Sequence, residues 1–154
     1  MKRIVFCILL LFTIISCEKP RDYYITFENN SNKTVIVDIG FGYPKDSINV
    51  IESMYIESLI QIRPNSSKNI FGGFEKPSSW YIDFYHSQTR CSGYVSFYIM
   101  DASVKRRHDL ETIQKEYMLL ARYDITQEDI ERLDWTISYP PAPEMHGVHM
   151  WISY

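Results

Sequence analysis

Apolar and polar side chains alternate along most of the chain after residue 22. In the first such run, Tyr23, Ile25 and Phe27 fall on one face, and the residues between them fall on the other. Alternation of this kind is typical of a β-strand with one buried face. The pattern predicts strands at residues 23–28, 34–39, 58–63, 69–71, 80–85, 94–99, 119–125 and 135–139.

Turn-forming residues, Asn29 to Asn32, separate the first two runs. Asparagine tolerates a positive φ angle and hydrogen-bonds its own backbone, so it favours turns. Two alternating runs on either side of such a turn predict a β-hairpin made of residues 23–28 and 34–39.

The hydrophobic period changes to that of a helix in two places after residue 108. Apolar residues within 110–120 share one helical face behind the N-cap Asp109, which predicts a helix of about two to three turns. Thr126 begins the second helix, with Asp129 at the reciprocal position of a capping box, and this helix ends near Leu133. Two short helices are therefore expected in the C-terminal half.

Regularly spaced strands separated by turns favour a sandwich or a barrel. We expect a mainly β protein, an antiparallel β-sandwich of about seven to eight strands with the two short helices. The 12 Tyr, 8 Phe and 3 Trp residues suit a pleated, half-buried surface. The expected core comprises Ile25, Phe27, Val35, Val37, Ile60, Ile62, Trp80, Ile82, Phe84, Val95, Phe97, Ile99, Ile113, Leu133, Trp135 and Ile137.

The start of the chain has a different pattern, that of an export signal. Lys2 and Arg3 precede an apolar run at residues 4–15. This run is too short to span a membrane as a helix, which needs about 20 residues. A non-lipidated signal peptide is an alternative, but the A-x-A-like pair of small residues that usually marks its cleavage site is absent.

Ser16 stands immediately before Cys17, with the aliphatic Ile14 three positions before the cysteine. This arrangement resembles the lipobox of bacterial lipoproteins, and the resemblance implies cleavage before Cys17. It also implies that Cys17 carries a diacylglycerol and that the new amino group receives a further acyl chain such as palmitate. Two or more acyl chains make a stable membrane anchor. We therefore expect a cell-envelope protein that is lipid-anchored at the outer membrane, with its periplasmic or surface side left open.

These patterns divide the chain into four parts. The expected parts are a signal peptide at 1–16, a lipidated tether at 17–22, the β-sandwich at 23–140 and a C-terminal tail at 141–154.

Two blocks of the chain resemble small lipoproteins of Bacteroidales. Residues 122–126 and 133–140, which read RYDIT and LDWTISYP, look like the C-terminal block of that family. The strand, Asn-rich turn and strand at the beginning look like its N-terminal half. The resemblance covers about residues 23–140 and concerns the fold. The family carries no assigned activity, so it implies no functional residues.

Charge and cysteine content narrow the class of function. Lys2 and Arg3 are removed with the signal, so the mature chain keeps 14 of the 16 basic residues and all 19 acidic ones. Its expected net charge is about −5. Binding to nucleic acid requires a basic footprint, so we discount that class of partner. Cys7 is removed and Cys17 is lipidated, which leaves Cys91 without an internal disulfide partner.

Tyrosines on two expected strands form the first candidate binding surface. Tyr81, Tyr85, Tyr94 and Tyr98 fall on the faces expected to point outward. If the two strands adjoin, these rings form an aromatic platform suited to sugar rings or to a protein partner, since aromatic residues are enriched at interfaces. The alternative is that helices or the C-terminal tail cover this face and make the tyrosines a second core layer.

The C-terminal segment holds a candidate metal site of low specificity. His146 and His149 lie between Met145 and Met150, and imidazole with thioether ligands suits copper, or zinc through the imidazoles alone. On a strand, the two histidines would point to opposite faces. We therefore expect a plain terminal segment that pairs with a sheet, and neither a metal nor another cofactor.

Asp46-Ser47-Ile48 resembles the three-residue O-glycosylation site of exported Bacteroidetes proteins, and the resemblance implies modification of Ser47. Short patterns of this kind also arise by chance. The segment lies in an expected loop, where a glycan would be accessible.

Motifs of common enzyme classes are missing from the sequence. It has no G-x-S-x-G elbow, no Gly-rich phosphate loop and no H-E-x-x-H helix. We expect a non-catalytic envelope protein, bound to the membrane through its lipid, that interacts with an envelope protein or a glycan. The alternatives are a carbohydrate-binding module that uses the tyrosine face, an envelope metal binder that uses the histidines, and an unrecognised hydrolase.

Overall fold

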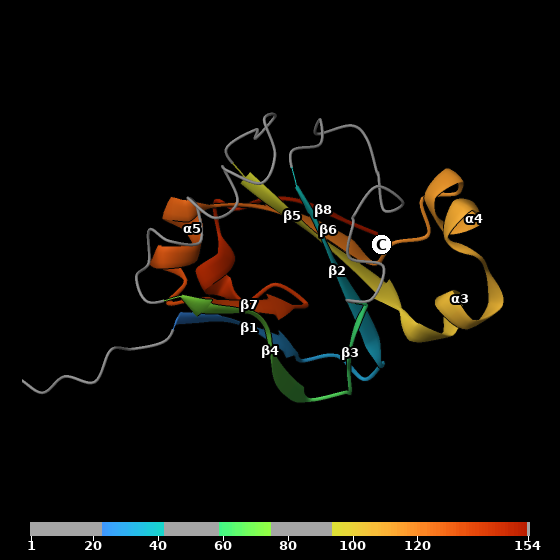
Figure 1. Ribbon diagram of the computed structural model, residues 1–154, viewed down its shortest axis with the longest axis horizontal. Helices are drawn as coiled ribbons and strands as arrows, with labels where there is room; N and C mark the ends of the chain where they lie inside the picture. The colour runs from blue at the N-terminus through green and yellow to red at the C-terminus, as the bar shows by residue number, and fades with distance from the viewer. Residues whose placement is uncertain (1–22, 42–58, 75–93, 154) are drawn as a thin grey trace, which may run out of the picture.

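Two β-sheets pack face to face in the computed structural model, which describes residues 23–41, 59–74 and 94–153 (Figure 1). The strands in these ranges are β1 (Tyr23–Asn29), β2 (Val35–Phe41), β3 (Ile60–Ile62), β4 (Ser66–Phe74), β5 (Tyr94–Asp101), β6 (Ala121–Thr126), β7 (Thr136–Tyr139) and β8 (His149–Ile152). The helices are α3 (Ala102–Arg107), α4 (Leu110–Lys115), α5 (Gln127–Arg132) and the 3-10 turn η2 (Pro143–Met145).

One sheet has the strand order β4-β1-β7 and the other has the order β3-β2-β5-β6-β8. The expectation of a mainly β, sandwich-like fold is confirmed. Two features differ from the expectation: β1 and β7 run parallel, and α3 is a helix that no hydrophobic periodicity predicted. The segment set apart as a C-terminal tail contributes η2 and the edge strand β8.

The hairpin expected between β1 and β2 is wrong, because the two strands lie in different sheets. The ladder positions of β1 are taken by β4 and β7. At the end of β1 the buried side chain of Asn29 turns the chain toward the other sheet. Its amide donates to the carbonyl oxygens of Lys33 at 2.7 Å, Arg63 at 3.0 Å and Ile62 at 3.2 Å. The Asn-rich segment is therefore a corner between sheets.

The main core lies between the two sheets and follows the alternation of the sequence. Most of the expected core residues are buried there, which confirms them: Ile25, Phe27, Val35, Val37, Ile62, Val95, Phe97, Ile99, Leu133, Trp135 and Ile137. Ile60 is partly buried against this cluster. Trp80, Ile82 and Phe84 lie outside the described residues, as does the expected strand at 80–85.

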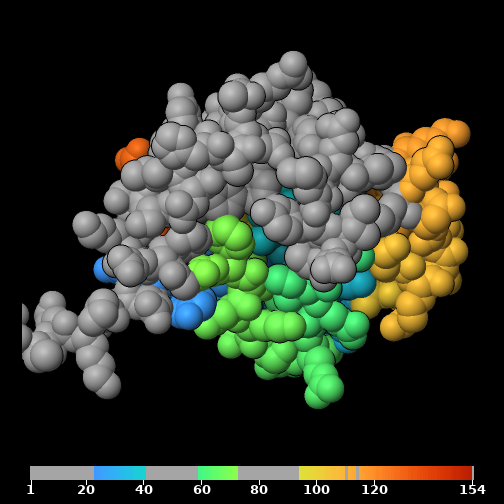
Figure 2. Space-filling view, in the orientation of Figure 1, coloured from blue at the N-terminus to red at the C-terminus, as the bar shows by residue number. Residues whose placement is uncertain are grey.

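A second, smaller core covers the opposite face of the five-stranded sheet, which we call the outer face. Ile113 of α4 and Leu119 pack there against Ile36 of β2 and Tyr98 of β5. Figure 2 shows the residues of α3 and α4 gathered at one end of the molecule, away from the start of β1. The outer face is thus buried at this end by the helices.

Both expected helix starts carry side-chain caps. The Asp109 carboxylate accepts from the Thr112 backbone N–H at 2.7 Å, but α4 is shorter than expected and ends at Lys115. Thr126 and Asp129 form the expected capping box at α5. Burial opposes ionisation of Asp129, but hydrogen bonds from Thr126 and then Arg132 outweigh it and hold the Asp129 pKa below its usual value.

Candidate functional site

The strand register places two rows of polar and aromatic side chains across the outer face. One row is Ser96, Asp124 and His149, and the neighbouring row is Tyr98, Arg122 and Trp151. Successive residues of a strand alternate between faces, so these residues share the face opposite the main core. The rows join β5, β6 and the edge strand β8.

Asp124 is the centre of this cluster and is almost completely buried. Its Oδ1 atom accepts from Ser96 Oγ at 2.7 Å and from Arg122 Nε at 2.8 Å. Its Oδ2 atom lies 3.0 Å from His149 Nδ1. The carboxylate therefore contacts a hydroxyl, a guanidinium and an imidazole at once, one from each of the three strands β5, β6 and β8.

Arg122 supplies the positive charge that stabilises the buried Asp124 carboxylate. Its side chain is only 3% exposed, and its guanidinium lies over the Tyr98 ring at 5.5 Å from the ring centroid. Burial disfavours the charged guanidinium, but the hydrogen bond to Asp124 outweighs burial and raises the Arg122 pKa. A buried ion pair with further hydrogen bonds fixes a geometry even where its net contribution to stability is small.

The order of contacts argues against nucleophilic catalysis at this cluster. In a Ser-His-Asp triad the histidine lies between the serine and the carboxylate and takes the serine proton. Here the carboxylate of Asp124 lies between Ser96 and His149. Ser96 is also fully buried, so a substrate cannot reach its hydroxyl. The arrangement is that of a satisfied structural network.

His149 is the exposed member of the network, with 56% of its side chain accessible. Contact with Asp124 through Nδ1 leaves Nε2 toward solvent, a geometry that metal-binding histidines often use. His146 lies in the turn before β8 and is exposed. Within the described ranges, however, no three His, Cys, Asp or Glu side chains come together in a way that could hold a metal ion.

The tyrosine face expected from the sequence needs correction at one residue. Tyr98 is completely buried in the second core, beneath α4, so it is not available for stacking on a ligand. Burial raises the pKa of its hydroxyl to about 12. Tyr94 is half-buried, whereas Tyr81 and Tyr85 lie outside the described residues. Tyr98 therefore follows the alternative in which helices cover this face.

The exposed aromatic residue of the outer face is Trp151, which the sequence analysis did not single out. Trp151 is 39% exposed and, with Tyr24, is one of two exposed large apolar residues in the described ranges. The Tyr117 ring contacts it edge-on, with ring centroids 4.5 Å apart. On the other face of β8, Met150 lines an open apolar groove together with Met145 and Val148. This strand therefore carries apolar groups on both of its faces.

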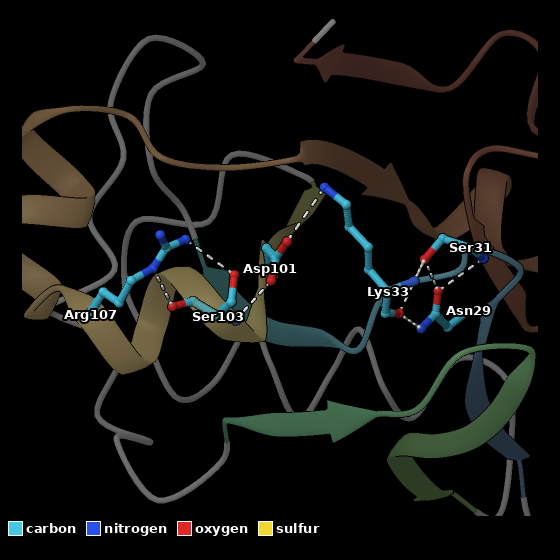
Figure 3. A network of polar contacts seen from close by, with 6 residues as sticks. All are labelled: Asn29, Ser31, Lys33, Asp101, Ser103 and Arg107. Carbon is cyan, nitrogen blue, oxygen red and sulfur yellow. Dashed lines mark hydrogen bonds and ion pairs between the residues drawn. The ribbon is translucent and has the colours of Figure 1, made fainter.

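A second polar network lies at the end of the molecule that carries α3 (Figure 3). Ser31 donates to the Asn29 side-chain oxygen at 2.7 Å, and Lys33 lies 3.5 Å from Asp101. Asp101 in turn accepts from the Ser103 backbone N–H at 2.7 Å and caps α3. These contacts hold the corner after β1 against the start of α3, which is a structural role.

The sequence analysis missed Ser96, Arg122 and Asp124 as a group. A signal for them existed, because Arg122 and Asp124 are two residues apart on a strand and so share a face. The facing position of Ser96 follows only from the β5–β6 register.

Two other expected sites, Cys17 and Ser47, lie outside the described residues, and so does Cys91. Comparisons of this chain with protein-family models, with curated proteins and with solved structures find no match. In the described ranges, none of the helices has the length and apolar character needed to cross a membrane.

Proposed function

We propose that this protein is a lipid-anchored, non-catalytic interaction module of the cell envelope. The proposal of a non-catalytic interaction module is supported by the difference between the buried and the exposed groups of the outer face. The serine and the carboxylate, Ser96 and Asp124, are buried and bonded to one another, and the exposed imidazole of His149 contacts Asp124. The apolar group left at the surface is the aromatic Trp151 on an edge strand. Such a surface suits binding, since aromatic residues are enriched at interfaces.

The first half of the proposal rests on the sequence around Cys17. An export signal followed by Ser16-Cys17 supports lipidation of that cysteine. Residues 18–22 then connect Cys17 to Tyr23, at most about 20 Å of extended chain. A tether of this length keeps the start of β1 close to the membrane. Tyr23, where the tether joins the domain, belongs to the three-stranded sheet, so the membrane would lie on that side of the domain.

The anchor is tested by changing Cys17 to Ala and separating membrane from soluble fractions. We expect the variant to move to the soluble fraction because it lacks its acyl chains. Cys91→Ala is the matched control, since it removes a cysteine downstream of the signal and is expected to stay with the membrane. A Cys17→Ala protein that fractionates like the control, or an intact mass without lipid, contradicts the anchor.

A second candidate function is sugar binding, which the exposed Trp151 favours over the tyrosine face first expected. Aromatic side chains with a nearby polar group suit sugar rings, and His149 lies on the same face, two residues away. A glycan array probed with the purified protein tests this alternative. We expect binding that Trp151→Ala abolishes and that the exposed control Tyr24→Ala retains; an array without signal removes the candidate.

A further inference from the structure

Among the described residues β8 lies at the edge of its sheet, and it has backbone groups that β6 does not use. Ser153 N–H donates to the Leu120 carbonyl at 2.9 Å, and the register pairs Arg122 with Trp151 and Asp124 with His149. In an antiparallel ladder, directly hydrogen-bonded pairs alternate with pairs that do not bond. His149 and Trp151 therefore bond toward β6, while the N–H and C=O groups of Met150 and Ile152 point away from it.

These outward groups form a self-complementary edge. If a second β8 lies antiparallel across it with Trp151 at the centre, Met150 of each copy stands opposite Ile152 of the other. Both residues then exchange N–H···O=C bonds, because both present their backbone groups outward. The two copies of Trp151 stand opposite each other in a non-bonded pair, where cross-strand side chains approach most closely.

The same register covers the exposed Trp151 on the outer face of β8 and the partly buried Met150 and Ile152 on its inner face. On the outer face it places one half-exposed Trp151 ring against the other. On the inner face it places Ile152 of one copy beside Met150 of the other, at the side of the apolar groove. An edge strand with free backbone groups and exposed apolar side chains is a template for pairing with another strand.

We propose that β8 pairs antiparallel with β8 of a second copy of this chain, so that the two five-stranded sheets become one continuous sheet. This inference rests on the proposed lipid anchor for its last argument. The two-fold axis of an antiparallel pair is perpendicular to the sheet, so both three-stranded sheets lie on the same side of it. Both copies of β1 begin in those sheets, and both tethers therefore reach the same membrane.

Pairing of this kind is short, because only Met150 and Ile152 contribute backbone bonds in each copy. Anchorage offsets this weakness, since two copies held in one membrane have a high effective concentration. The dimer is therefore expected to form on the membrane more readily than in dilute solution. An extended apolar segment of another protein is the competing occupant of the same edge, and the test below distinguishes it.

The test is disulfide trapping in the full-length protein in its own membrane. Trp151→Cys is made together with Cys91→Ser, so that the new thiol is the reporter. Antiparallel non-bonded neighbours have Cα atoms about 4.5 Å apart, within the range that a disulfide spans. We expect a homodimer on a non-reducing gel after mild oxidation. Tyr24→Cys in the same background is the exposed matched control. Trapping at 151 no stronger than at 24, or a mixed disulfide with a different protein, overturns the proposal.

A second substitution separates strand pairing from accidental collision. Met150→Pro added to the Trp151→Cys protein removes the N–H that points away from β6 and leaves the ladder to β6 intact. We expect the trapped dimer to fall at least tenfold while the thermal unfolding midpoint stays within a few degrees. Ile152→Lys, which places two charges at the paired edge, is the companion variant if the proline unfolds β8. Trapping unchanged by both contradicts pairing through the ladder.

Failure of the pairing and failure of the anchor give different results. The intact mass of the same sample reports the lipid independently of the disulfide. A lipid-bearing chain without trapping at 151 overturns the pairing alone. A trapped dimer of chains without lipid keeps the pairing and overturns the argument from two tethers in one membrane.

Discussion

The two faces of the five-stranded sheet are both buried, but by different chemistry. The inner face presents apolar side chains to the three-stranded sheet, such as Val37, Phe97 and Ile125. The outer face combines a small apolar cluster under α4 with the buried pair Arg122 and Asp124. Apolar contact is non-directional, whereas a carboxylate with several donors fixes the positions of all of them. The outer face therefore defines the position of β8, and the inner face supplies most of the buried apolar area.

The comparison predicts that the largest loss of stability comes from the outer face. Asp124→Ala leaves the Arg122 guanidinium buried without its carboxylate, which costs about 4 kcal/mol of unfolding free energy. Urea unfolding measures this change. Glu116→Ala removes an exposed carboxylate from the turn after α4 and is the control, with an expected change within about 0.5 kcal/mol. A loss below about 1 kcal/mol for Asp124→Ala would show that water reaches the cluster.

The inner face is tested by Ile99→Ala. Ile99 is completely buried between the sheets, and its truncation removes apolar contact and leaves a cavity. We expect a loss of about 3 kcal/mol in the same urea experiment. The double variant with Asp124→Ala sharpens the comparison between the faces. If the faces act independently the two losses add, and a large departure from additivity would show that they are coupled through the sheet.

Alkaline pH tests the outer face through Tyr98. Burial raises the Tyr98 pKa to about 12, above the value near 10 of an unfolded chain. The stability associated with the neutral hydroxyl is therefore fully present below pH about 10 and is lost as pH rises toward 12. Tyr98→Phe should reduce the decline between pH 7 and pH 11 by about 1 kcal/mol. An unchanged decline, measured by urea unfolding at the two pH values, would indicate that the hydroxyl ionises as readily in the fold as outside it.

The smallest expected effect lies outside both faces, at the cap of α5. Thr126→Ala removes the hydroxyl that accepts from the Asp129 N–H at 3.1 Å, at a cost of about 1 kcal/mol at pH 7. Because the Asp129 pKa is lowered in the fold, the stability that the ionised box provides is present above pH about 4 and is lost as pH falls through the folded pKa. The difference between the unfolding midpoints of the two proteins should therefore narrow at low pH, where Thr126 Oγ1 no longer donates to an ionised Asp129 carboxylate. A difference of the same size at both pH values contradicts the role of the carboxylate.

The sequence was sufficient to locate β1, β2, β5 and β7 and the core face of each of them. Alternation placed Ile25 and Phe27, and equally Val35 and Val37, in the core, because a buried face imposes a period of two residues. The capping box of Thr126 and Asp129 located α5, since its two residues are only three positions apart. Features of this kind depend on residues that are close in the sequence, so the sequence alone predicts them.

The pairing of strands and the second buried face could not be read in the same way. Alternation states which side chains share a face, but it does not state which strand lies alongside, so β1 and β2 were paired wrongly. Asp124 and Arg122 occupy positions that alternation assigns to solvent, and only the register with β5 and β8 shows that they are buried together. The outward position expected for Tyr98 is wrong because α4 folds back over β5 and covers it, which alternation within β5 does not indicate.

We propose that a lipid on Cys17 holds the described domain at a membrane. Intact mass spectrometry of the native protein, extracted from its membrane, measures this lipid without any other assumption. We expect a chain that begins at Cys17 and carries a diacylglyceryl group and a further acyl chain. A chain that retains residues 1–16, or one that begins at Cys17 without fatty acid, would contradict it.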